Sequence, residues 1–288
     1  MPLPHDLRMR SATDADLPVI GALREAVGWT VHDWALRAVL EPTEARCVVV
    51  ADALDRIVGV GSGIAYDALG VVGNMVVAED HRRRGVGSAV LEAIIDFLAR
   101  ERGCSRLELN ATSEGRPLYE RHGFETIGDS SVGRIGRDIG LEPDESVAIR
   151  RAGTGDLDAL AAYDRPRFGG DRGFLLRLLL AEAASPFLVA ERAGEMVGYG
   201  CVRVDGPRIG PMVADAPSVA QTLLWNAFEA VPGVDEWRLN LPPGNRAGAE
   251  WLRGLGVEVE PWDGRMARGP QILRRDDTIY GMTVGALG

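Results

Sequence analysis

A chain of 288 residues with a hydrophobic fraction of 46% is long enough for two domains, each with a core of its own. Its net charge of −10 argues against a general affinity for nucleic acid or for an anionic membrane surface. No apolar signal core is visible at the N-terminus and no apolar run approaches about 20 residues, so the chain is expected in the cytoplasm. The three cysteines show no metal-ligand spacing, which predicts buried thiols and no metal.

The first part of the chain predicts helices and an antiparallel sheet. The expected elements are a strand at 7–10, a helix capped by Thr13 or Asp14 that runs to Val27, a second helix at 31–40, and strands at 46–52 and 57–65. A short turn joins the last two strands, which predicts a hairpin. Gly59, Gly61 and Gly63 lie in the second of these strands, where missing side chains indicate a bulge or the close approach of another element.

Residues 71–124 carry the most informative pattern. An apolar, β-branched run at 71–77 predicts a buried strand. After a charged turn, apolar residues recur every three or four positions from Val86 to Leu98, which predicts an amphipathic helix that ends at Gly103. Residues 106–110 alternate apolar and polar side chains, as a second strand does. The unit is therefore a strand, a glycine turn, a helix and a strand.

The turn between the first strand and the helix has the composition of an anion site. Residues 82–88 read RRRGVGS. Backbone N–H groups in the first turn of a helix have no intrahelical partner, and the helix dipole adds partial positive charge there. Glycines let the backbone approach a phosphate closely, and arginines add charge and donors. The alternative is a tight turn with a solvated basic face, but the strand before it and the helix after it favour phosphate binding.

Three phosphate-binding motifs compete for this turn. A P-loop requires Lys and then Ser or Thr after its last glycine, which residues 88–89 do not provide. A dinucleotide fingerprint requires a third small residue where Val90 stands, although Glu108 lies at a suitable distance downstream and keeps this alternative open. The third motif, Arg-x-x-Gly-x-Gly, is matched completely by residues 82–87.

This third motif is the pyrophosphate signature of the Gcn5-related N-acetyltransferase (GNAT) family, which the chain resembles. The resemblance includes the strand end Met75–Val77, which precedes the motif, and a later Tyr-x-x-x-Gly-Phe formed by Tyr119, Gly123 and Phe124. One position departs from the family pattern, because Thr112 stands where many relatives have Asn.

The resemblance implies acetyl-CoA as co-substrate, with its pantetheine arm added as a strand to an exposed backbone edge. The residues it assigns to acetyl-CoA binding are Met75, Val76, Val77, Arg82, Arg83, Arg84, Gly85, Val86, Gly87 and Ser88. A backbone N–H of Val76 or Val77 would stabilise the oxyanion that forms when an amine attacks the thioester. For Arg82 the alternative is a solvated arginine or a surface ion pair with Glu79 or Asp80.

The same resemblance assigns Tyr119 as the catalytic acid that protonates the departing thiolate. Its alternative is a packed core tyrosine beside Phe124. The base that deprotonates the amine is not assigned. Asn74 and Asp67 are expected near the pocket, and a chain of water molecules is the alternative.

The chain repeats itself after a polar segment at 140–146. Identical residues recur at a nearly constant offset along the sequence: Arg10 and Arg150, Asp16 and Asp156, Met75 and Met212, Val76 and Val213, Leu107 and Leu239. The offset falls across the glycine turn, and the second copy has neither the arginine run nor the glycine pair. Leu252 stands where Tyr119 stood in the first copy. We therefore predict two copies of one fold, of which the second does not bind the cofactor.

The predicted fold class is α/β (α+β), with two tandem GNAT-like domains, as in a bacterial subgroup with a degenerate second domain. The expected boundaries are 1–139 for the catalytic domain, 140–146 for a linker and 147–288 for the degenerate domain. The resemblance implies that each domain is a mixed, mostly antiparallel sheet flanked by helices, with a splayed central strand pair.

The implied function is an N-acetyltransferase that moves an acetyl group from acetyl-CoA to a primary amine of a small molecule or peptide by direct attack. The alternative is a non-catalytic acetyl-CoA sensor or binding module that uses the second copy for partner contacts. Neither nucleic acid nor a membrane is expected as a partner, and a homodimer is left open. The acceptor amine and the acyl-chain preference do not follow from the sequence.

Overall fold

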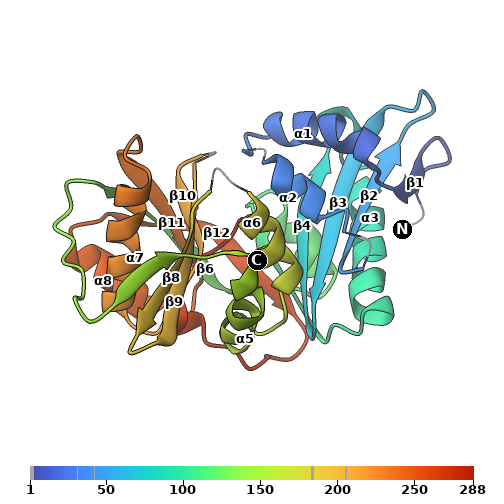
Figure 1. The fold of residues 1–288 in the computed structure, drawn as a ribbon. Coiled ribbons are helices and arrows are strands. Elements are labelled where there is room, and N and C mark those ends of the chain that lie inside the picture. Colours follow the sequence, from blue (N-terminus) through green and yellow to red (C-terminus); the bar gives the residue numbers. More distant parts are fainter. Residues whose placement is uncertain (1–2, 31, 42, 183–184, 205) are drawn as a thin grey trace. The chain divides into compact units, whose positions relative to one another are not determined.

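The computed structural model describes residues 3–30, 32–41, 43–182, 185–204 and 206–288. They form two compact units (Figure 1). Unit 1 consists of the chain up to Thr126 together with Met266–Ile272 and Gly285–Gly288, and unit 2 consists of Ile127–Arg265 and Leu273–Val284. The units are therefore not two consecutive stretches of chain, since residues 127–139 lie in unit 2 and two late segments lie in unit 1. The linker at 140–146 stays a prediction.

Unit 1 is built on a mixed, mostly antiparallel sheet. Its strands are β1 (Arg8–Ser11), β2 (Ala45–Ala51), β3 (Ile57–Tyr66), β4 (Leu69–Val77) and β5 (Arg106–Ala111), in that order, and the end of β12 (Val259–Arg268) follows β5. β1 to β4 are antiparallel neighbours, whereas β4 and β5 are parallel. The hairpin of β2 and β3 is confirmed, with Val49 opposite Val60.

Helices cover both faces of this sheet (Figure 1). α1 (Leu17–Glu25) and α2 (Asp33–Ala38) lie on one face, and α3 (Val86–Asp96), extended by a π-helical turn at Phe97–Glu101, lies on the other. The glycines of β3 make room for α3: a Cβ atom at Gly59 would lie 2.8 Å from Val86 of α3, and one at Gly63 would lie 2.7 Å from Ile94. The close approach predicted for this strand is thus confirmed. A short helix, α4 (Arg116–Arg121), follows β5.

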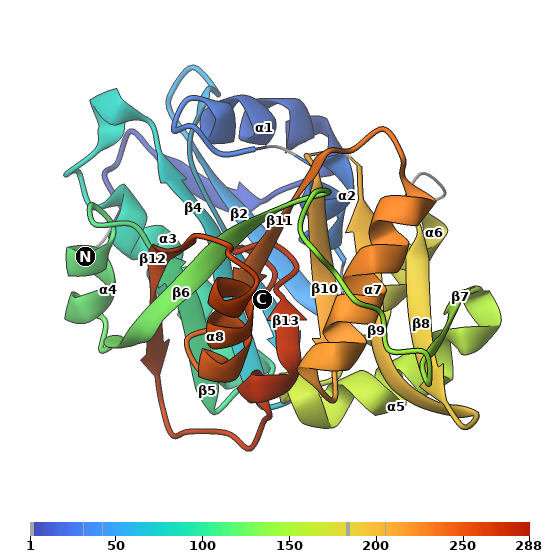
Figure 2. The ribbon, with the colours of Figure 1, turned by 90° about the vertical axis from the view of Figure 1, so that its left-hand side faces the viewer.

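Unit 2 has strands and helices of its own. Its strands are β6 (Glu125–Gly136), β11 (Glu236–Leu241), β10 (Arg208–Ala214), β9 (Glu195–Arg203), β8 (Phe187–Arg192) and β7 (Ala148–Arg151), in that order, and β13 (Ile279–Gly281) also pairs with β10. Its helices are α5 (Leu157–Phe168), α6 (Gly173–Ala181), α7 (Pro217–Ala230) and α8 (Arg246–Gly254). α7 packs against β8, β9 and β10 (Figure 2).

β6 corrects one expectation. From the sequence alone, two short strands are expected after α4, at 125–127 and 133–138. The structure has a single strand, since Ser131 and Val132 pair with Leu241 and Asn240 of β11 and so continue the extended backbone.

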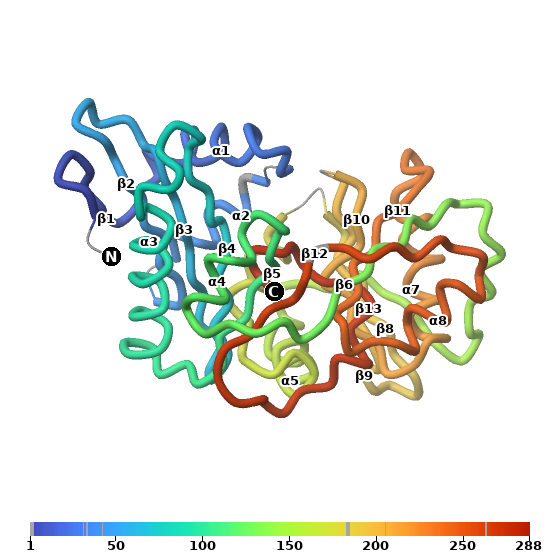
Figure 3. The backbone as a smooth tube through the Cα atoms, turned by 180° about the vertical axis from the view of Figure 1, so that it is seen from behind, coloured from blue at the N-terminus to red at the C-terminus, as the bar shows by residue number. Residues whose placement is uncertain are grey.

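The two units contain two copies of one fold, as the repeat predicted. Arg10 forms two hydrogen bonds of 2.7 Å to the carboxylate of Asp16, and Arg150 forms the same pair with Asp156 at 2.8 and 3.0 Å. The order β1-β2-β3-β4-β5 in unit 1 recurs as β7-β8-β9-β10-β11 in unit 2. Figure 3 traces the backbone by residue number, so the late segments of unit 1 can be followed in red.

All three cysteines are buried, as predicted. Burial raises the pKa of Cys47 to about 12 and that of Cys104 to about 11. Within the described residues, no group of three or more His, Cys, Asp or Glu side chains is placed to hold a metal ion. In the same part of the chain no helix combines the length and the apolar character needed to span a membrane.

Candidate functional site

The candidate site begins at a bulge in β4. Gly73 pairs with Ser62 and Val76 pairs with Val60, so two residues of β4, including Asn74, lie opposite one residue of β3. Asn74 has a φ of 54°, in the left-handed region that asparagine adopts more readily than most residues. Bulges redirect the backbone and occur often beside active sites. Met75–Val77, which the sequence assigned to the pantetheine arm, begin inside this bulge.

β4 and β5 separate after three residue pairs. Leu69–Val71 of β4 pair with Arg106–Glu108 of β5, and no further pair joins these two strands, all of whose residues are described. β4 continues to Val77 and β5 continues to Ala111. This is the splayed central pair that the resemblance implied. Beyond the third pair, β5 does not close the edge of β4, and an extended chain can add there as a strand.

The first turn of α3 directly follows the glycine turn. Gly85 precedes the helix with a φ of 83°, and its carbonyl accepts a helical hydrogen bond from Ala89 N at 3.0 Å. The N–H groups of Val86, Gly87 and Ser88 come before this bond, so helix geometry gives them no acceptor inside the helix. The helix dipole adds partial positive charge at the same place. The turn therefore has the geometry of an anion site.

Arg82 is held beside the end of β4. Its Nε donates to the carbonyl oxygen of Val77 at 3.1 Å, and its Nη1 lies 3.6 Å from Oε2 of Glu114. The alternative considered for Arg82 was an ion pair with Glu79 or Asp80. The structure does contain an ion pair, but with Glu114.

The other two arginines of the turn differ in exposure. Arg83 is exposed and has a φ of 61°, so the backbone turns sharply there. Arg84 is half-buried, and its Nη2 lies 2.7 Å from Oδ2 of Asp6. The hydrogen bond from Arg84 lowers the pKa of Asp6. Arg84 thus ties the turn to the N-terminal segment.

Tyr119 lies in α4 and belongs to the core of unit 1. Its side chain is 6% exposed, and its ring meets the ring of Phe124 edge to face, with centroids 6.1 Å apart. A Cβ atom at Gly115 would lie 3.1 Å from the tyrosine ring. The packing expected of a core tyrosine is present. The proposed role of its hydroxyl as an acid stays a prediction.

Of the two polar residues expected near the pocket, Asp67 lies elsewhere. It is exposed in the turn between β3 and β4, at the end of β4 farthest from the bulge, so the expected position was wrong. Asn74 lies in the bulge and is 3% exposed. Its Nδ2 donates to Oγ of Ser62 at 2.8 Å, while its Oδ1 is buried and accepts no hydrogen bond from the residues described.

In unit 2 the corresponding gap is filled by the chain itself. The counterparts of Met75 and Val76 are residues 212–213 of β10, and both pair with β13. On the other side, Met282 N, directly after β13, donates to the carbonyl oxygen of Asn240 in β11 at 2.7 Å. β13 therefore occupies, as an added strand, the position that a pantetheine arm would take in the first copy.

The helix that follows also differs between the copies. α7 begins at Pro217, which has no backbone N–H, and Ala216 precedes it in an extended conformation. The left-handed glycine that precedes α3 has no counterpart before α7. The second copy thus offers fewer donors to an anion.

A late segment of the chain covers β4 and β5 of unit 1. The hydroxyl of Tyr66 donates to the carbonyl oxygen of Leu287 at 2.8 Å, and the amide of Asn110 donates to the carbonyl oxygen of Gly285 at 3.4 Å. A side chain at Gly73 would collide with the residue between them. Sequence reasoning missed this segment, because its small apolar residues carry no signal of what they contact.

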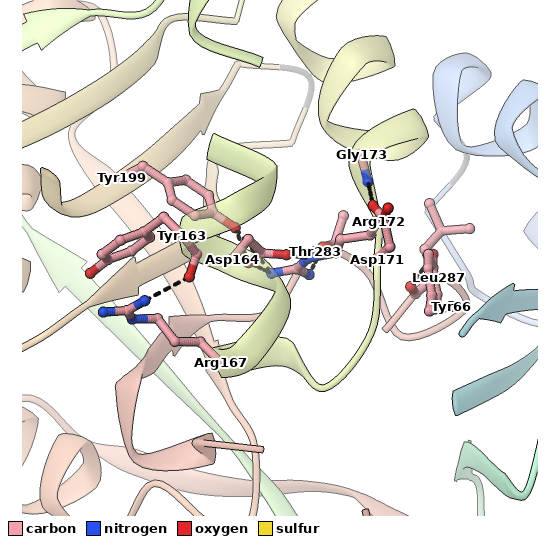
Figure 4. Close-up of polar contacts among 10 residues, drawn as sticks. All are labelled: Tyr66, Tyr163, Asp164, Arg167, Asp171, Arg172, Gly173, Tyr199, Thr283 and Leu287. Carbon is pink, nitrogen blue, oxygen red and sulfur yellow. Dashed lines mark hydrogen bonds and ion pairs between the residues drawn. The ribbon is translucent and has the colours of Figure 1, made fainter. Parts of the chain in front are cut away.

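Thr283, which precedes this segment, is bonded to a buried ion pair of unit 2 (Figure 4). Arg172 and Asp164 form two hydrogen bonds of 2.7 and 2.9 Å, and each side chain is 1% exposed. Arg172 also donates to Oγ1 of Thr283 at 3.3 Å, and the hydroxyl of Tyr199 donates to Asp164 at 2.5 Å. Burial raises the pKa of Tyr199 well above its ordinary value, so the phenol keeps its proton as a donor.

Comparison with known proteins agrees with this geometry. Two family models, each described as an acetyltransferase (GNAT) domain, match residues 44–126 and 160–281. Over 162 residues the chain is 27% identical to YitH of Bacillus subtilis (strain 168), described as an uncharacterized N-acetyltransferase. That match covers 55% of this chain and 56% of YitH, so the chain spans just over half of that relative's length.

Two solved structures show the same fold. A protein of Pyrococcus horikoshii, provisionally described as an acetyltransferase, matches 100% of this chain and 98% of its own, with a TM-score of 0.80 and 24% identity. A tandem GNAT protein from the clavulanic acid biosynthesis pathway matches 92% of this chain and 99% of its own, with a TM-score of 0.65 and 14% identity. Together with the two domain matches, these likenesses show that the chain belongs to the GNAT acetyltransferase family and carries two GNAT domains in tandem.

Proposed function

We propose that this chain transfers an acetyl group from acetyl-CoA to a primary amine of a small molecule or peptide, and that its first copy alone binds acetyl-CoA. The supporting observation is the contrast between the copies. In the first copy β5 leaves the edge of β4 open, and the first amides of α3 have no intrahelical acceptor. In the second copy β13 pairs with the corresponding edge, and α7 starts at Pro217.

The residues of the first copy fit the parts of acetyl-CoA. The backbone amides from Arg83 to Ser88 would bind the pyrophosphate, and the arginine side chains would add charge. The backbone of Met75–Val77 would pair with the pantetheine arm. A Cβ atom at Gly87 would lie 3.3 Å from Leu118. The absence of a side chain at this position therefore leaves room for a phosphate to approach the first turn of α3.

The reaction is a direct transfer. A neutral amine attacks the thioester carbonyl, an N–C bond forms, and the C–S bond breaks with its electron pair on sulfur. The N–H of Val76 or Val77 would donate to the carbonyl oxygen as negative charge develops on it. Tyr119 would give its proton to the departing sulfur, the nitrogen would lose one proton to solvent, and Tyr119 would regain a proton from solvent, so that the amine and the thioester yield an amide and a thiol.

The test uses the full chain. Free thiol is measured after mixing it with acetyl-CoA and each of n-propylamine, tyramine, spermidine, glucosamine and a lysine-containing peptide. We expect amine-dependent thiol release with at least one of them. Calorimetric titration with acetyl-CoA alone should give one site per chain. Binding without any thiol release would favour the acetyl-CoA sensor, and two equivalent sites would contradict the proposed difference between the copies.

A further inference from the structure

Asn74 has a buried oxygen to which none of the described residues donates a hydrogen bond. The side chain is 3% exposed, its Nδ2 donates to Ser62 at 2.8 Å, and its Oδ1 has no hydrogen-bond partner in the part of the chain that the structure describes. Leaving a buried amide oxygen unpaired is costly, so such atoms in folded proteins call for an explanation. A bound ligand that donates an N–H to this oxygen would provide such an explanation.

The backbone at Asn74 is also in an unusual conformation. A φ of 54° is strained for most side chains and is tolerated by Asn, Asp and Gly. Residues with strained backbone conformations of this kind are frequent at ligand sites, where the surrounding structure stabilises the conformation. Here the β3–β4 ladder supports it, because Gly73 and Val76 on either side of the bulge remain paired.

The amide of Asn74 lies on the face of the sheet opposite α3. Gly61 and Gly63 of β3 point toward α3, since a Cβ atom at Gly63 would lie 2.7 Å from Ile94 and one at Gly61 would collide with α3 as well. Side chains alternate along a strand, so Ser62 between them points to the other face. The hydrogen bond to Ser62 places the amide of Asn74 on that face too.

This face is the acceptor side of the proposed thioester position. Asn74 immediately precedes Met75–Val77, the edge assigned to the pantetheine arm, and the phosphate-binding turn leads into α3 on the opposite face. An amine must reach the thioester from the side that the cofactor does not fill. The segment Gly285–Leu287 covers β4 and β5 on this same side, through its contacts with Tyr66 and Gly73.

Resting on the proposed acetyl transfer, we propose that Asn74 binds the acceptor amine, with Oδ1 accepting an N–H of the attacking nitrogen. Ser62 orients the amide for this role. As the N–C bond forms, the nitrogen gains positive charge, and a neutral amide oxygen stabilises that charge without taking the proton. A primary amine suits this site, because one N–H can bond to Asn74 while the lone pair points at the carbonyl.

Two substitutions separate this role from a structural one. Asn74→Gly removes the amide and keeps a residue that accepts the positive φ. Asn74→Asp keeps an oxygen acceptor at the same place, which the hydroxyl of Ser62 can support as donor. Asp67→Gly is the matched control, because Asp67 has nearly the same φ, 55°, at the other end of β4.

The measurements are the Kd for acetyl-CoA, the melting temperature, and the KM and kcat for whichever amine of the panel releases thiol fastest. We expect Asn74→Gly to raise the amine KM about tenfold, the effect of losing one hydrogen bond to a group that becomes charged. Acetyl-CoA affinity should stay near that of the wild type, whereas the melting temperature should fall by a few degrees, because the buried hydroxyl of Ser62 loses its bond to Asn74. Asn74→Asp should keep the amine KM within about threefold of wild type, and Asp67→Gly should leave it unchanged.

The proposal is overturned if Asn74→Gly leaves the amine KM unchanged, or if it weakens acetyl-CoA binding instead. It is also overturned if Asn74→Asp raises the amine KM as much as Asn74→Gly does, since the amide would then act as a donor. Wild-type protein that binds no acetyl-CoA, or releases no thiol with any amine, would refute the acetyl transfer itself and this proposal with it. The wild-type measurements therefore report on the function, and the comparison of variants reports on Asn74.

Discussion

Placing a carboxylate in the first turn of α3 tests the proposed phosphate site most directly. In Gly87→Asp the new Cβ would lie 3.3 Å from Leu118 and 3.8 Å from Val77, so a small side-chain shift accommodates it. Two unit charges at about 4 Å repel by roughly 4 kcal/mol at an effective dielectric of about 20, which is close to a thousandfold in affinity. We therefore expect acetyl-CoA binding to be lost in the titration range of the wild type.

The same substitution should not weaken the fold. An acidic side chain in the first helical turn interacts favourably with the dipole by about 0.3 to 1 kcal/mol, and replacing glycine inside a helix adds some helix propensity. Stability and cofactor affinity should thus change in opposite directions. A mutation that damaged the fold would lower both.

The assay is calorimetric titration with acetyl-CoA, combined with urea unfolding, on three variants. Gly87→Ala adds only the Cβ atom, and Gly87→Asn adds a neutral side chain of the same shape as Asp. The difference in Kd between Gly87→Asp and Gly87→Asn isolates the charge and should shrink as salt is raised. Equal Kd values for these two variants would mean that no phosphate lies near Gly87, and the reasoning would be refuted.

Other substitutions test the acid, the buried ion pair and the pH response. Tyr119→Phe should lower kcat by about 10² to 10⁴ with acetyl-CoA affinity and melting temperature kept, whereas an equal kcat would leave Tyr119 as a core residue. Asp164→Asn should cost roughly 3 to 5 kcal/mol in urea unfolding, because the buried guanidinium of Arg172 loses its carboxylate. Asp156→Asn, which breaks the more exposed pair with Arg150, should cost under about 1 kcal/mol; similar losses would contradict the role of burial. The hydrogen bond from Arg10 lowers the pKa of Asp16 in the folded state, so its stabilisation is present above the unfolded pKa of about 3.9 and is lost as the pH falls below that value. In Asp16→Asn the melting temperature should accordingly fall less steeply as the pH is lowered. An unchanged dependence of the melting temperature on acidic pH would contradict the role of this ion pair.

The parts of the fold that the sequence predicted are those with local patterns. The strand, glycine turn and helix from β4 to α3 were predicted because apolar periodicity and glycine chemistry act over a few residues. Three glycines at alternate positions predicted a bulge or a close backbone approach at β3, and the structure shows that the neighbour is α3. The antiparallel hairpin of β2 and β3 likewise followed from its short turn.

Features that depend on distant segments were not predicted. β13 has three residues, too few for a pattern, and its pairing with β10 brings together residues more than sixty positions apart. β6 was divided in two, because polar residues in a strand look like a turn until their partner strand is known. The buried amide of Asn74 could not be located either, since it depends on Ser62 across the ladder, and Asp67 was placed at the wrong end of β4.

The late segments of unit 1 also have a consequence for how the protein is made. The hydrogen bond from Tyr66 to Leu287 joins residues 221 positions apart, and the one from Arg106 to Gly269 joins residues 163 positions apart. Contacts of such separation form late, because the intervening chain must first be ordered. During synthesis the N-terminal domain emerges from the ribosome long before residues 266–272 and 285–288. Until these arrive, β5 lacks its neighbour β12, and Gly73 and Tyr66 lack the residues that cover them. The nascent chain thus carries an exposed strand edge that the finished protein does not, and a pause in translation before residue 266 would prolong that exposure.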